Sequence, residues 1–125
     1  MVVNGIIMIE SDVQKNIISY LRHKRVYHFR FQAQSNLNGL PDIICLYKGF
    51  FLGLELKREK GGAPTLLQLK KIKAINDNGG IGVIVRSVDE VDDIFILIDI
   101  YGKSISNQEL LDKYEEIRMN KNEKI

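Results

Sequence analysis

The chain lacks the features that mark disulfide-rich, membrane-spanning or thiolate-metal proteins. Its 125 residues include a single cysteine, Cys45, which excludes an internal disulfide and a cysteine metal site. The apolar neighbours of Cys45 predict a buried, small hydrophobic residue. No apolar run is long enough to span a bilayer, and the start lacks the basic flank and cleavage site of a signal peptide. We therefore expect a soluble, cytoplasmic, single-domain protein with no membrane partner.

Neither sign of charge dominates the whole chain, but the two signs are unevenly distributed. The net charge is +2, yet residues 1–86 hold 13 basic and 6 acidic residues, a balance of +7, whereas residues 87–125 hold 5 and 10, a balance of −5. The first region has the balance that a polyanion attracts. Ordinary solvated surface explains the same counts, so charge alone leaves both interpretations open.

Hydrophobic periodicity predicts an α/β domain whose core has the element order αβββαβ. The spacing of apolar residues changes between a period of about 3.6 residues and a period of two residues along the chain, with glycine or proline at most of the changes. The predicted elements are residues 11–23, 26–34, 42–47, 50–57, 65–78 and 81–85. The strand at residues 26–34 alternates between an apolar and a polar face, and the strand at residues 81–85 is continuously apolar, as in an inner parallel strand.

Four pairs of residues have the spacing of a helix capping box, in which the first side chain and the fourth bond to each other's backbone amides. They are Ser11 with Gln14, Thr65 with Gln68, Ser87 with Glu90, and Ser106 with Glu109. The last two pairs predict helices after the core strands. We expect one domain over residues 1–125, with its core at about 10–98 and a C-terminal helical extension at about 99–125.

The hairpin at residues 42–57 places charged residues together. With a two-residue loop at Lys48 and Gly49, opposed positions sum to 97, so Asp42 opposes Glu55 and both point to the same face. Alternation adds Lys57 to that face and puts four apolar residues on the other. These are Phe50, Leu52, Leu54 and Leu56.

Two carboxylates this close repel each other unless one is protonated or a cation lies between them. Oxygen ligands favour a hard ion, and Mg²⁺ is usually held by one or two carboxylates. Lys57 would then orient a metal-bound water or stabilise charge on a phosphate, which is the apparatus of phosphodiester hydrolysis. Gly53 lies on the same face and leaves room for a ligand or a neighbouring backbone.

The combined motifs resemble the PD-(D/E)XK nuclease superfamily and, within it, the virus-type replication-repair nuclease (VRR-NUC) domain. The resemblance runs from about Glu10 to Ile98. Its motifs are Gly39-Leu40-Pro41-Asp42, Glu55-Leu56-Lys57, Pro64-Thr65-Leu66-Leu67-Gln68 and the strand at residues 80–85. The resemblance implies a restriction-endonuclease-like fold with a mixed sheet flanked by helices.

The resemblance also implies roles for individual residues around Mg²⁺, for which Mn²⁺ would substitute. The metal ligands would be Glu10, Asp42, Glu55 and the carbonyl of Leu56, while Lys57 would act on the nucleophile and Gln68 would lie beside the site. Glu10 has a competing interpretation as a carboxylate that complements the positive end of a helix, and Asp12 is an alternative first-helix acid. For Gln68, helix capping alone is the competing interpretation.

For function, the resemblance implies cutting of four-way (Holliday) DNA junctions by a homodimer, in DNA repair within a bacterial cell or a phage-infected host. The chain has no base-reading motif, so we expect recognition of DNA shape, with Arg30, Arg58 and Lys60 as the phosphate contacts nearest the site. The competing functions are a flap, end or duplex nuclease and a non-catalytic DNA-binding module. A surface ion-pair cluster on an unrelated α/β protein is the third alternative.

Overall fold

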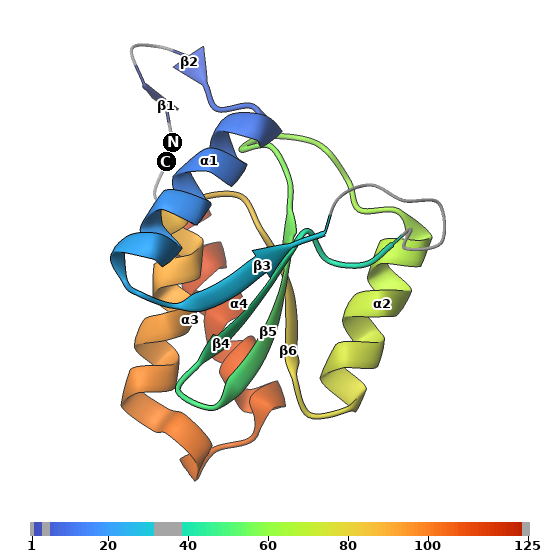
Figure 1. The fold of residues 1–125 in the computed structure, drawn as a ribbon, viewed down its shortest axis with the longest axis vertical. Coiled ribbons are helices and arrows are strands. Elements are labelled where there is room, and N and C mark those ends of the chain that lie inside the picture. Colours follow the sequence, from blue (N-terminus) through green and yellow to red (C-terminus); the bar gives the residue numbers. More distant parts are fainter. Residues whose placement is uncertain (1, 4–5, 32–38, 124–125) are drawn as a thin grey trace.

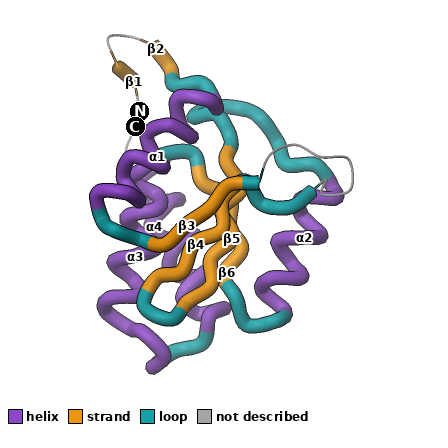
Figure 2. The backbone as a smooth tube through the Cα atoms, viewed as in Figure 1, coloured by secondary structure: helices purple, strands orange, loops and turns teal. Residues whose placement is uncertain are grey.

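The protein forms one four-stranded sheet with helices on both faces (Figures 1 and 2). The computed structural model describes residues 2–3, 6–31 and 39–123. Its elements are β1 (Val2–Val3), β2 (Ile6–Ile7), α1 (Glu10–His23), β3 (Tyr27–Arg30), β4 (Ile43–Tyr47), β5 (Phe50–Leu56), α2 (Leu66–Asp77), β6 (Ile81–Val85), α3 (Val88–Tyr101), the 3₁₀ helix η2 (Gly102–Ser104) and α4 (Asn107–Glu123).

The main sheet has the order β3-β4-β5-β6, and the predicted αβββαβ core is confirmed. Strands β3, β4 and β5 pair antiparallel, whereas β5 and β6 pair parallel across the α2 crossover, which makes the sheet mixed. The short strands β1 and β2 form a separate antiparallel pair before α1. In the part of the chain that the structure describes, no helix is long and apolar enough to cross a membrane.

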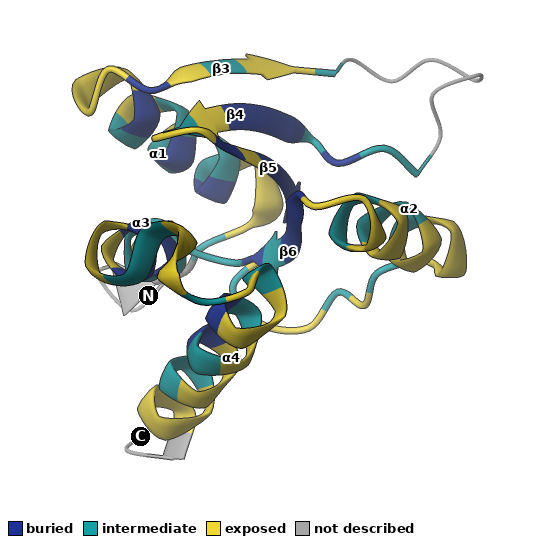
Figure 3. Ribbon diagram, turned by 90° about the horizontal axis from the view of Figure 1, so that it is seen from below, coloured by how far each residue is buried: buried dark blue, intermediate teal, exposed yellow. Residues whose placement is uncertain are grey.

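The two faces of the sheet are covered by different helices. Helices α1 and α3 pack on one face with α4 packed against α3, while α2 packs on the opposite face over β5 and β6 (Figure 3). The face toward α1 and α3 carries the main hydrophobic core. Its strand residues are Ile43, Cys45, Phe50, Leu52, Leu54, Leu56, Ile81, Val83 and Val85. The burial predicted for Cys45 is confirmed, since its side chain is fully enclosed.

Two glycines let α2 lie close to the sheet. Gly53 of β5 pairs with Gly82 of β6 on the face that α2 covers. A Cβ on Gly53 would lie 2.7 Å from Cδ1 of Ile75 and 2.9 Å from Cγ of Pro41. A Cβ on Gly82 would lie 2.9 Å from the backbone oxygen of Ile72. The space beside Gly53 is therefore filled by two side chains, not by the ligand or backbone that the sequence suggested.

Three of the four expected helix caps are present. Thr65 with Gln68 and Ser106 with Glu109 make both reciprocal bonds of a capping box, and the hydroxyl of Ser87 accepts a hydrogen bond from the amide of Glu90. The prediction of a capping box formed by Ser11 and Gln14 at the start of α1 was wrong.

Helix α1 begins at Glu10, its N-cap residue is Ile9, and no side chain caps it. Tertiary contacts hold this end instead, because the amide of Glu59 donates to the carbonyl of Met8 and the amide of Met8 donates to Oε2 of Glu59.

Strand β3 is shorter than the predicted residues 26–34, and residues 32–38 lie outside the described part of the chain. The alternation is present, but the apolar face is the exposed one: Tyr27 is 67% exposed and Phe29 is 42% exposed. The expected boundary near residue 98 falls inside α3, which continues to Tyr101. Leu110 and Tyr114 of α4 are buried in the same core, so the C-terminal helices are part of the domain's packing.

Candidate active site

The β4–β5 hairpin has the predicted register. Its loop residues Lys48 and Gly49 have φ values of 48° and 85°, the left-handed pair of a type I′ turn, whose twist matches the flanking strands. Tyr47 pairs with Phe50, and every pair in the ladder sums to 97. The amide of Phe31, the residue after β3, donates to the carbonyl of Asp42 at 3.1 Å, which extends the pairing to the position opposite Glu55.

Glu55 is the only charged residue among the described residues that is fully buried, at 1% exposure. Its Oε2 accepts a hydrogen bond of 2.9 Å from Nε2 of Gln68 and lies 3.8 Å from Nζ of Lys57. Its Oε1 is buried and has no hydrogen-bond partner among the described residues. A buried carboxylate oxygen without a partner is costly, so this atom requires an explanation.

Burial first, and then the adjacent Asp42 carboxylate, raise the pKa of Glu55 to about 8. The charge of Asp42 raises the pKa of Glu55, so the two carboxyl groups lie close together. The ammonium of Lys57 opposes the rise in pKa, and the charge of Glu10 adds to it. Without a cation, the pair keeps a proton at neutral pH.

Asp42 is held in place by the strand it opposes. Its Oδ2 accepts a hydrogen bond of 2.8 Å from the amide of Leu56. A buried oxygen without a partner on one carboxylate and a second carboxylate close to it fit a hard divalent cation such as Mg²⁺.

Lys57 is the first residue after β5, and its side chain is only 12% exposed. Its backbone amide donates to the carbonyl of Val85 at 3.1 Å, which fixes where the side chain starts. The low exposure of Lys57 and Glu55 excludes a solvated surface ion pair. The ammonium group therefore acts in a partly enclosed space, where its charge is weakly screened.

Gln68 serves both of the roles that the sequence left open. Its Oε1 accepts a hydrogen bond of 2.8 Å from the amide of Thr65, and its own amide donates to Oγ1 of Thr65 at 3.1 Å. The same side chain donates from Nε2 to Glu55. Because the cap fixes the carboxamide oxygen, the amino group of Gln68 is aimed at the acidic pair.

Glu10 is the first residue of α1 and is exposed, with Asp12 in the same helical turn. The effect of Glu10 on the pKa of Glu55 places it near the acidic pair. Over residues 6–31 and 39–123, however, no three His, Cys, Asp or Glu side chains converge closely enough to hold a metal ion. The structure thus brings Asp42 and Glu55 together without a third carboxylate, and the ligand roles of Glu10 and of the Leu56 carbonyl stay predictions.

The predicted phosphate contacts lie on two sides of the acidic pair. Arg30 pairs with Ile43, the residue that follows Asp42 in sequence. Its side chain therefore lies near the position of Asp42 but on the face of the sheet opposite Glu55. Arg58 and Lys60 are exposed in the loop between β5 and α2. All three are accessible, and their contact with DNA stays a prediction.

Sequence reasoning missed Arg86. This residue follows β6, and its guanidinium donates to the carbonyls of Arg58, Gly61 and Gly62. It therefore ties down the loop that joins Lys57 to Gln68. An arginine after an apolar strand gives no signal of this role, because its partners are backbone carbonyls more than 20 residues earlier in the chain.

A solved structure of a VRR_NUC domain is similar to this chain, with a TM-score of 0.59 and 22% sequence identity. The similarity covers 70% of this chain and 94% of that one. No family model and no curated protein matches the sequence. The likeness shows that the chain has the VRR-NUC fold, and the expectation of a restriction-endonuclease-like α/β domain is confirmed.

Proposed function

We propose that this protein is a Mg²⁺-dependent, structure-specific DNA endonuclease that resolves four-way junctions as a homodimer. One observation carries the proposal: Glu55 is 1% exposed and lies close to Asp42, and its Oε1 has no partner among the described residues. A protein without a cationic ligand here gains nothing from burying one carboxyl group close to another. The VRR-NUC fold supports the same interpretation.

Each side chain of the site has a separate role in the proposed hydrolysis. A divalent ion held by Asp42 and Glu55 would lower the pKa of a bound water and neutralise charge on the phosphate. Gln68 keeps Glu55 oriented through its hydrogen bond, and Asp42 is oriented by the amide of Leu56. Lys57, whose Nζ is 3.8 Å from Glu55, would supply a positive charge to the attacking oxygen or the phosphate.

Metal binding is testable apart from cleavage. Calorimetric titration of Mg²⁺ or Mn²⁺ into the wild type should give a heat of binding that Asp42→Asn abolishes. The control is Asp77→Asn, an exposed carboxylate on α2 that pairs with Lys73. No heat with either ion in the wild type would contradict the metal site and favour a protein that only binds DNA.

The homodimer is supported by an apolar surface that the described residues leave exposed. Tyr27, Phe29, Leu46 and Phe51 lie on the sheet face opposite α1, at 67%, 42%, 47% and 43% exposure. An aromatic side chain presents roughly 150–250 Å², so these four side chains leave roughly 400 Å² of apolar surface. A standard interface takes about 800 Å² from each partner, of which somewhat more than half is apolar, so the surface matches the core of a dimer of this chain.

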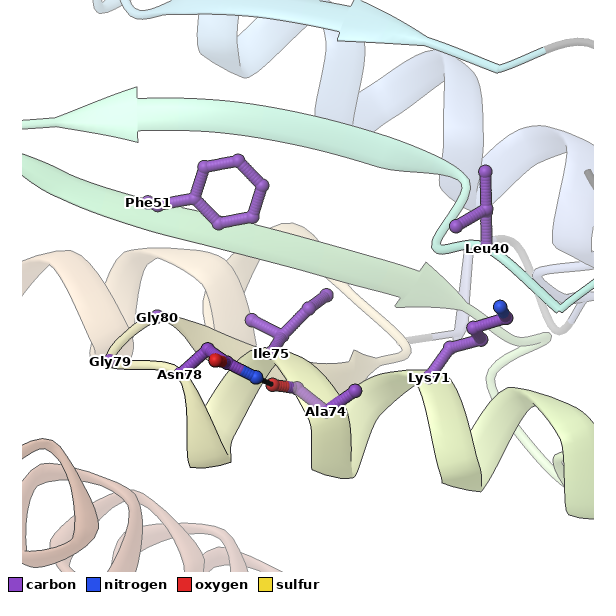
Figure 4. A pocket seen from close by; sticks show the side chains of 8 residues that line it. All are labelled: Leu40, Phe51, Lys71, Ala74, Ile75, Asn78, Gly79 and Gly80. Atoms are coloured by element: carbon purple, nitrogen blue, oxygen red, sulfur yellow. Dashed lines mark hydrogen bonds between the residues drawn. The ribbon is translucent and has the colours of Figure 1, made fainter.

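An apolar hollow of about 410 Å³ adjoins this surface at Phe51, between β5 and α2 (Figure 4). Its lining residues are Leu40, Phe51, Lys71, Ala74, Ile75, Asn78, Gly79 and Gly80. It is separate from the acidic pair and is suited to receive an apolar side chain of the second copy. Light scattering after gel filtration should give a dimer for the wild type and a monomer for Leu46→Asp; a wild-type monomer at micromolar concentration, even with DNA, would contradict the dimer.

The function itself is tested by cleavage of labelled four-way junction, flap, single-stranded and duplex DNA with Mg²⁺ or Mn²⁺. Wild type should cut the junction best, in paired nicks, and Asp42→Asn and Lys57→Ala should not cut. Preferential cutting of flaps, ends or duplex would replace the junction with that substrate. If no DNA is cut with either ion, a DNA-binding module becomes the better explanation.

A further inference from the structure

A positively charged hollow lies away from Asp42 and Glu55, on the side of the molecule where α1 meets the edge strand β3. It has a volume of about 360 Å³. It is lined by Ile18, Arg22, His28, Phe29 and Arg30. Three of these five side chains can carry a positive charge, and none can carry a negative one.

The arginines of this hollow are not neutralised by the protein. In the described ranges, no carboxylate forms an ion pair with Arg22 or Arg30, and the segment 32–38 that follows contains no acidic residue. The hollow at Arg86 and Arg118 is different. It also contains Glu59, Asp89, Glu90 and Asp93. There Asp93 binds Lys121 at 2.7 Å, so that hollow has internal counter-charges.

A hydrogen bond to the backbone orients the imidazole ring of His28. Its Nδ1 lies 2.8 Å from the carbonyl oxygen of Val26. A carbonyl only accepts, so Nδ1 carries the hydrogen and Nε2 is the nitrogen left free for another partner. Two unpaired guanidinium groups and a fixed imidazole around one hollow are a donor set for a phosphate group.

We propose that Arg22, Arg30 and His28 form a binding site for a backbone phosphate of DNA, on the face of the sheet opposite the acidic pair. The inference rests on the proposed function for the identity of the polyanion. Arg30 is one strand, about 4.8 Å, from the Asp42 end of β4, and Arg22 is about 18 Å along α1 from Glu10. With a rise of about 3.4 Å per nucleotide, the bound phosphate lies a few nucleotides from the one being cut.

The site gives a measurable signature in the salt dependence of binding. The experiment uses Asp42→Asn as a non-cutting background and measures the anisotropy of fluorescein-labelled junction DNA between roughly 50 and 200 mM KCl. Each phosphate contact releases roughly one counterion, so the slope of log Kd against log salt reports the number of contacts. Arg22→Gln and Arg30→Gln should each raise Kd about tenfold and reduce the slope of log Kd against log salt by about one. Arg30→Lys should keep most of the slope, because it keeps the charge.

The matched control is Arg118→Gln, an arginine of α4 that is paired with Glu115 at 2.9 Å and should change neither value. An unchanged slope in the Arg22→Gln/Arg30→Gln double variant would overturn the proposal, as would an equal loss in the control. Heat from inorganic phosphate alone that the double variant abolishes, with DNA affinity unchanged, would also overturn it and assign the hollow to free phosphate.

The cleavage and binding experiments distinguish an error in the phosphate site from an error in the nuclease activity. If wild type cuts DNA and the double variant binds it equally well, only the phosphate site is wrong. If wild type cuts nothing but the arginine variants show the expected slopes, only the nuclease activity is wrong.

Discussion

The two faces of the β4–β5 hairpin differ in what they do, although they alternate residue by residue along the same strands. Toward α1 and α3, Leu52, Leu54 and Leu56 are completely buried in the main core. Toward α2, the neighbouring positions hold Gly53, Glu55 and, just beyond the strand, Lys57. One face provides the burial that holds the strands in place, and the other uses the positions so fixed for charge.

This difference explains why the buried carboxyl group of Glu55 is tolerated at its position. A seven-residue strand with four apolar residues pointing into the core can hold a costly group on its other face, because the backbone has no freedom to move it into water. Substitutions on the two faces should therefore separate activity from stability.

The largest effect is expected from Lys57→Ala on the charged face. Loss of the ammonium group should reduce the cleavage rate by about 10²–10⁴-fold with little change in melting temperature, since the proposed role of the side chain is in the chemistry and it is not part of the core. The measurement is single-turnover cleavage of junction DNA together with thermal unfolding. Lys73→Ala on α2, an exposed lysine, is the control and should cut at the wild-type rate.

Leu54→Ala on the core face should have the opposite consequence. Truncating a completely buried leucine leaves a cavity, which lowers the free energy of unfolding by about 2–5 kcal/mol. Urea denaturation measures this loss, and the cleavage rate per folded molecule should stay near wild type. Leu46→Ala, at a position 47% exposed on the other face, should cost much less. Equal costs at the two positions would contradict the division between the faces.

Gly82→Ala should affect both properties at once. Its Cβ would lie 2.9 Å from the backbone oxygen of Ile72, so α2 must move away from the sheet. We expect a loss of about 1–3 kcal/mol in the free energy of unfolding. The shift also weakens the bond from Gln68 to Glu55, so cleavage should fall even under conditions where the variant is fully folded. A stable variant with wild-type activity would show that the contact of α2 with the sheet is not needed to position Gln68.

The raised pKa of Glu55 makes stability depend on pH. Between the ordinary pKa of 4.5 and about 8, the folded metal-free protein keeps the Glu55 proton that the unfolded chain has released. The free energy of unfolding therefore falls as pH rises through this range, and Glu55→Gln should remove that loss. Thermal unfolding in EDTA at pH 5 and pH 8 should show the variant gaining on wild type at the higher pH. Exposed Glu116→Gln is the control, and curves for wild type and Glu55→Gln that stay parallel would contradict the expectation.

The sequence predicted those parts of the site that depend on local spacing. A two-residue loop at Lys48 and Gly49 fixes the register, and the register alone brings Asp42 opposite Glu55. The capping box predicted where α2 begins and therefore where Gln68 lies. Both results follow from short-range geometry that composition and spacing encode.

The parts that depend on distant neighbours were not predictable in this way. Ser11 has the spacing of a cap, but the start of α1 is held through Met8 by Glu59, about 50 residues away in sequence. The role of Arg86 depends on a loop at residues 58–62, and that of Gly82 depends on how closely α2 approaches. The apolar face of β3 predicted a strand correctly, but not that Tyr27 and Phe29 would be exposed.

The side chain of Gln68 makes the first turn of α2 a reporter of the acidic pair. Its oxygen completes the helix cap while its nitrogen holds Glu55, so neither bond can be altered without affecting the other. Amide hydrogen exchange at the start of α2 should therefore respond to the ionisation or ligation of Glu55. Transient unwinding of that turn, in reverse, releases the carboxylate, so the local opening equilibrium of one helix end and the state of the site are linked as two sides of one thermodynamic cycle.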